Sequence, residues 1–84
     1  MEYSNTHYLS GEMILAGDRV RCAAWTGVVM FCNGNNSYAA EYDREYWRSE
    51  GPGFMIEYEE AGLVFSEWAN EDLVLVERKS ALPS

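Results

Sequence analysis

Short apolar segments separated by turn residues are the feature that most constrains how this chain can fold. Five such segments alternate with Gly, Asn, Asp and Pro residues, which favour tight turns. Segments this short suit strands better than helices, and strands at this spacing are typical of a small barrel or of two packed sheets. The predicted strands cover residues 19–23, 27–32, 54–59, 63–68 and 73–77.

The longest connection lies between the second and third strands. Within residues 38–49, apolar residues recur at helix-like intervals but few are β-branched, which predicts one or two helical turns inside a long loop. The tripeptide at 51–53, Gly-Pro-Gly, ends any helix. We therefore expect a mainly β fold, a five-stranded small barrel over residues 13–77. A flexible or edge segment, residues 1–12, precedes it, and a polar tail, residues 78–84, follows it.

The two cysteines, Cys22 and Cys32, bear on the compartment. A hairpin turning about Trp25–Thr26 would place them several residues out of register, so we expect two free thiols and no disulfide. The N-terminal residues have neither the basic start nor the apolar run of a signal peptide. Both observations predict a cytoplasmic protein.

The charge balance constrains the partner. The chain has 14 Asp and Glu residues against 6 Lys and Arg residues, a formal charge of -8. This charge repels phosphate backbones and anionic lipid headgroups, so neither nucleic acid nor a membrane is an expected partner. Such a charge also favours solubility, and attraction of a basic protein is the alternative interpretation.

The residues that could carry catalysis do not form a reactive set. His7 is the one imidazole and lies in a polar segment, without the further ligands that zinc or a catalytic triad would need. Glu57 and Glu59 have strand spacing and point to one face, opposite Ile56 and Tyr58, as on a solvated surface. We therefore expect no enzyme activity, no metal and no cofactor.

Motifs near both ends of the strand pattern resemble those of Src-homology-3-like small barrels, in particular the KOW and Tudor-like group. Gly17–Arg21 and Trp25–Val29 look like the signature of the first hairpin, and Asn70–Val76 is similar to the turn and last strand that close such barrels. KOW domains that bind RNA carry basic loops, whereas the loops of this chain are acidic. The pattern also resembles small bacterial proteins, some encoded beside toxins as immunity factors.

Aromatic and charged residues interleave in the long loop. Tyr and Trp anchor many protein interfaces because they combine a large rigid area with a polar group. The same rings could instead form a lid over one open end of the barrel, and both alternatives stay open. The candidate binding residues are Trp25, Tyr38, Tyr42, Glu45, Tyr46 and Trp47.

We therefore expect a non-catalytic module, monomeric or weakly dimeric, that binds a protein or peptide. Glu41, Asp43 and Glu45 would orient a basic partner and raise its association rate. One alternative is an immunity or antitoxin-like inhibitor of a basic toxin. A second is a reader of methylated lysine, in which Tyr42, Tyr46, Trp47 and Glu45 would form an aromatic cage.

Overall fold

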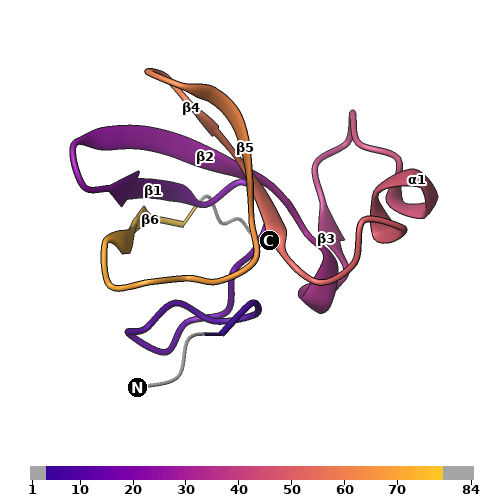
Figure 1. The fold of residues 1–84 in the computed structure, drawn as a ribbon, viewed down its shortest axis with the longest axis horizontal. Coiled ribbons are helices and arrows are strands. Elements are labelled where there is room, and N and C mark those ends of the chain that lie inside the picture. The colour runs from indigo at the N-terminus through magenta and orange to yellow at the C-terminus, as the bar shows by residue number, and fades with distance from the viewer. Residues whose placement is uncertain (1–3, 79–84) are drawn as a thin grey trace.

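A computed structural model describes residues 4–78 of the chain as one antiparallel sheet with a short helix (Figure 1). The strands are β1 (Arg19–Cys22), β2 (Trp25–Cys32), β3 (Ser37–Tyr38), β4 (Phe54–Tyr58), β5 (Gly62–Ser66) and β6 (Leu73–Glu77). The α-helix is α1 (Arg44–Arg48), and a 3-10 helix, η1 (Asn33–Asn35), follows β2. The mainly β class is confirmed, as is a short helix in the long connection. No helix among the described residues is long and apolar enough to span a membrane.

The strand order is β5-β4-β2-β1-β6, and β3 pairs with the end of β2. Within residues 4–78, β5 pairs only with β4 and β6 only with β1, so the sheet has two open edges. The predicted five-stranded closed barrel is therefore wrong in strand number and in closure. Between β5 and β6 the chain pairs with the N-terminal segment instead, where the Ala69 amide donates to the Ser4 carbonyl oxygen at 2.8 Å.

The first hairpin turns earlier than its sequence indicates. Cys22 lies opposite Trp25, so the turn consists of Ala23 and Ala24 and the predicted turn at Trp25–Thr26 is wrong. Ala23 adopts a left-handed φ of 55°, a conformation that alanine rarely takes. Both cysteines are free thiols, as predicted.

The core lies against one face of the sheet, here called the core face. Phe54, Ile56 and Tyr58 share this face, as the two-residue period predicts. The N-terminal segment covers it and contributes Tyr8, which is 2% exposed, from residues 4–12. Residues 1–3 of the predicted flexible or edge segment and 79–84 of the predicted tail lie outside the described residues. The core cluster comprises Tyr8, Ile14, Val20, Val29, Cys32, Phe54, Ile56, Tyr58, Ala69 and Leu73.

A β-bulge at Met30 gives the opposite side of the sheet, the outer face, an apolar region of its own. Val29 pairs with Ile56 and Phe31 pairs with Met55, so Met30 is an extra residue on β2. The insertion moves Phe31 off the core face. Phe31, Met55 and Phe65 then form a row across three neighbouring strands.

One buried carboxyl group joins distant parts of the chain. Asp18, 1% exposed, accepts hydrogen bonds from the Tyr8 hydroxyl at 2.7 Å and the Leu15 amide at 3.0 Å. The Arg78 guanidinium donates to both of its oxygens, at 3.0 and 3.1 Å. These bonds attach the N-terminal segment and the residue after β6 to the turn before β1.

Candidate functional site

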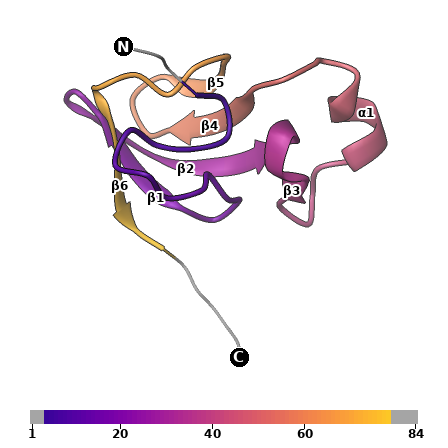
Figure 2. The same ribbon diagram turned by 90° about the horizontal axis from the view of Figure 1, so that it is seen from below.

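The segment from β3 through α1 packs its rings on the outer face. It projects from one end of the sheet in both views of the fold (Figures 1 and 2). The Phe31 ring lies at the centre of these contacts, with ring centroids 5.5 Å from Tyr38, 5.6 Å from Tyr42 and 5.2 Å from Trp47. We call the three rings on Phe31, from Tyr38, Tyr42 and Trp47, the aromatic cover.

Asn33 holds the two ends of this segment together. Its side-chain amide donates to the carbonyl oxygens of Trp47 at 2.9 Å and Gly51 at 2.7 Å, and its Oδ1 accepts from the Tyr38 hydroxyl. Asp43 caps α1 by accepting the amide of Glu45 at 3.0 Å. The cover is therefore fixed by polar contacts at its ends as well as by its rings.

Gly53 lets the chain return from α1 to β4 close to the sheet. Its φ is 139°, and a Cβ atom there would lie 2.6 Å from Cζ of Phe65 and 2.7 Å from the carbonyl oxygen of Ser66. Only glycine meets both conditions without strain. The Gly-Pro-Gly tripeptide thus positions the segment as well as ending the helix.

Tyr46 differs from the cover in its exposure. It is 60% exposed, and its ring stands edge-on to Trp47 at 4.8 Å with an interplanar angle of 90°. Glu45 is exposed beside it in the first turn of α1. Of the predicted binding residues, five therefore lie together in this segment, with three rings on the sheet and Tyr46 turned to solvent.

Trp25, the sixth predicted residue, lies elsewhere. Its ring contacts Tyr58 of the core face at 5.4 Å, at the opposite end of β2 from Phe31. It is 43% exposed. The structure thus does not bring Trp25 to the aromatic cover.

Two of the three rings in the predicted methyl-lysine cage, Tyr42 and Trp47, already pack on Phe31 of the sheet. The third ring, Tyr46, stands edge-on to Trp47 at 4.8 Å. The packing on Phe31 counts against the cage, which stays a prediction from the sequence.

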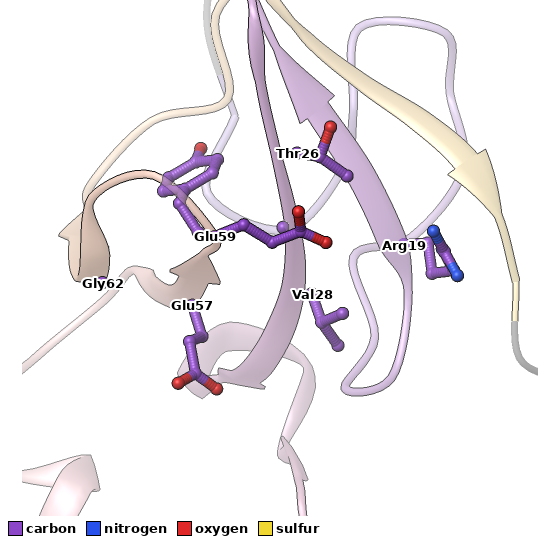
Figure 3. A pocket seen from close by; sticks show the side chains of 8 residues that line it. Arg19, Thr26, Val28, Glu57, Glu59 and Gly62 are labelled. Carbon is purple, nitrogen blue, oxygen red and sulfur yellow. The ribbon is translucent and has the colours of Figure 1, made fainter.

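A groove of about 450 Å³ opens on the outer face next to the cover (Figure 3). Glu57 and Glu59 line one side, Thr26 and Val28 lie between, and Arg19 lies on the far side. A second hollow of about 330 Å³ shares Arg19 and Val28 with the groove. Its lining also includes Gly17 and Glu77, so the two hollows together cross β4, β2 and β1.

The aromatic cover lies close enough to the groove for the charge of Glu57 to act on Tyr42. Burial raises the pKa of the Tyr42 hydroxyl, and the negative charges of Glu57 and Glu41 raise it further. Across the groove, Nε of Arg19 lies 4.0 Å from Oε1 of Glu77, an exposed pair. Glu60 accepts the amide of Thr26 at 3.1 Å, which attaches the turn after β4 to the start of β2.

His7, the imidazole singled out in the sequence, lies in the N-terminal segment. His7 is exposed, and its Nδ1 lies 2.9 Å from the Thr6 hydroxyl. Within residues 4–78, no three His, Cys, Asp or Glu side chains gather closely enough to hold a metal ion. The role of Asn33 could not be predicted from the sequence, because Asn33–Asn36 is typical of a turn and the partners of its side-chain amide nitrogen are 14 and 18 residues away.

Comparison with protein-family models, with curated proteins and with solved structures finds no significant match to this chain. The fold defines a small mainly β domain whose six-stranded antiparallel sheet carries apolar groups on both faces.

Proposed function

We propose that this chain is a non-catalytic module that binds another protein through the surface around Tyr46. The supporting observation is an exposed ring on a fixed base. Tyr46 stands on Trp47, and Trp47 packs on Phe31 of the sheet. An aromatic ring held in this way loses little conformational freedom on binding, which is a property of interface anchors.

Acidic residues of the same segment favour a partner with a basic surface. Glu41, Asp43, Glu45 and Glu50 are all exposed around Tyr46 in the sequence. They would attract a basic surface and speed association more than they tighten the final complex. A basic toxin belongs to this class of partner, and the formal charge of -8 favours this second candidate function, an immunity-type inhibitor.

We also propose that the sheet is an open relative of the Src-homology-3-like small barrel. Two features support this relationship. The segments that resemble the first-hairpin signature contribute β1 and β2, which pair with each other. The segment that resembles the closing strand contributes β6, which pairs with β1.

The test of the function is affinity capture with matched aromatic variants. Wild-type protein, Tyr46→Ala and Trp68→Ala are immobilised, incubated with extract of the native host and compared by quantitative mass spectrometry. Trp68 is 55% exposed and outside the ring contacts of the cover, so it controls for the loss of any exposed ring. We expect at least one protein whose recovery falls about tenfold with Tyr46→Ala alone. Equal recovery of every protein by all three baits would contradict the proposal.

A further inference from the structure

The groove on the outer face is separate from the Tyr46 surface, because Tyr46 is not among the residues that line it. It combines carboxylates with apolar surface. Val28 in the lining is 37% exposed. Leu63, which pairs with Glu57 on the neighbouring strand β5 and lies outside the lining, is 53% exposed. In Figure 3 the Glu59 side chain extends across β2, over the space between Thr26 and Val28.

The negative charge of this groove is not balanced from within the described residues. Neither Glu57 nor Glu59 forms an ion pair with any residue from 4 to 78, since the ion pairs there are Arg19 with Glu77 and Arg78 with Asp18. Arg19 is the one cation in the lining, and Glu77 faces it from the other side. The groove therefore offers two exposed carboxylates beside apolar surface.

We propose that this groove binds a lysine or arginine side chain of an extended basic segment in the protein partner. The methylene stem would lie on Val28, and the charged head would lie between Glu57 and Glu59. Lysine and arginine combine an apolar stem with a cationic head, which matches this lining. The inference rests on the proposed function, because the same partner would also contact Tyr46.

The shape of the surface favours an extended segment. The groove continues into the second hollow through Arg19 and Val28, so an occupant can run across three neighbouring strands. Strands lie about 4.8 Å apart and an extended chain advances about 3.3 Å per residue, so about three to five residues cover this path. A second copy of this chain is a poor occupant, because both copies carry a formal charge of -8.

The test uses a defined probe instead of the natural partner. A capped peptide of about five residues, alternating lysine and valine, is titrated into the full chain and followed by amide chemical shifts. Matched peptides carry glutamine or glutamate in place of lysine. We expect the lysine peptide alone to bind, with its largest shifts at Thr26, Val28 and Glu57, three of the residues that line the groove.

Charge-matched variants separate the groove from the overall acidity. Glu57→Gln combined with Glu59→Gln should weaken the lysine peptide about tenfold. Glu67→Gln combined with Asp72→Asn changes the net charge equally, at exposed residues outside both the groove and the Tyr46 surface, and should weaken it less than about twofold. Equal weakening by both pairs, equal binding of the glutamine peptide, or no binding of the lysine peptide would overturn the inference.

Tyr46→Ala distinguishes this inference from the proposed function. It should leave the short peptide's affinity within about twofold, because Tyr46 is not among the residues that line the groove. A natural partner lost with Tyr46→Ala but bound normally by the Glu57→Gln, Glu59→Gln protein would leave the proposed function standing and refute the groove. If the lysine peptide binds as predicted but no protein depends on Tyr46, the groove inference would stand and the proposed function would be refuted.

Discussion

The side-chain amide of Asn33 donates to the carbonyl oxygen of Trp47 at 2.9 Å, and this bond joins the end of β2 to α1. The same nitrogen donates to Gly51 at 2.7 Å. Asn33 thus ties the helix and the start of the return to β4 to one point on the sheet. The exposed ring of Tyr46 is fixed relative to the groove because the segment that carries it is held there.

Asn33→Ala should loosen this segment. The substitution leaves the carbonyl oxygens of Trp47 and Gly51 without the side-chain donor they now share, and we expect a loss of about 2 kcal/mol in the free energy of unfolding. Urea denaturation measures the loss, and hydrogen exchange over residues 39–51 should become faster. Ser49→Ala is the matched control, because it removes an exposed hydrogen bond to Tyr46 in the same segment. A control loss as large as that of Asn33→Ala would refute the role given to Asn33.

Tyr8→Phe should destabilise the fold through the buried Asp18. The variant removes a hydroxyl that donates to this carboxyl group at 2.7 Å, in a site where Asp18 is 1% exposed. Hydrogen bonds to charged groups contribute about 1.5–3 kcal/mol to stability. We expect the free energy of unfolding to fall by an amount near the lower end of this range, because Leu15 and Arg78 still donate to Asp18. Tyr46→Phe, which alters an exposed ring, should change stability by less than about 0.5 kcal/mol. Indistinguishable urea midpoints for the two variants would count against the Asp18 contact.

Stability should fall at alkaline pH. Burial raises the pKa values of the Cys32 thiol and of the Tyr8 and Tyr58 hydroxyls, so the folded protein keeps protons that the unfolded chain releases. This contribution is complete below the unfolded pKa values and is lost as pH rises above about 8.5 for cysteine and about 10 for tyrosine. Urea midpoints should therefore decrease from pH 9 to about pH 11, and less steeply in Tyr8→Phe. A midpoint that stays constant or rises over that interval would contradict the burial of these groups.

The strands could be predicted from the sequence where local pattern decides the structure. The alternation of Phe54, Ile56 and Tyr58 places them on the core face, as observed. The short helix also follows from local spacing, and it forms at Arg44–Arg48 after the Asp43 cap. These features depend on neighbouring residues, which the sequence displays directly.

The errors arise where distant pairing overrides local preference. Nothing in the sequence marks a turn at Ala23–Ala24, since alanine has no turn preference and Ala23 must take a φ of 55° to continue the pairing. The bulge at Met30 likewise has no signature, yet it moves Phe31 to the outer face. Barrel closure failed as a prediction because the resembling motifs specify the first hairpin and the last strand, and leave the pairing of β5 with β6 undetermined.

The candidate site was predictable in composition more than in geometry. Aromatic residues in the loop pointed to Tyr38, Tyr42, Tyr46 and Trp47, and the structure places all four in one segment. Sequence spacing gave no means of separating the exposed Tyr46 from the rings on Phe31. The groove was missed because its lining comes from β1, β2, β4, β5 and the turn between β4 and β5, and the pairing that brings these segments together cannot be seen in the sequence.

The proposed function rests on the packing of Trp47 on Phe31, and nuclear Overhauser contacts between these two rings in solution test this packing most directly. Their centroids are 5.2 Å apart, so contacts between ring protons should be strong in the wild type. They should weaken in Asn33→Ala, which removes the bond that ties Trp47 to the sheet. A wild-type protein without such contacts, with the Trp47 ring moving freely in solvent, would contradict the arrangement from which the Tyr46 surface is inferred.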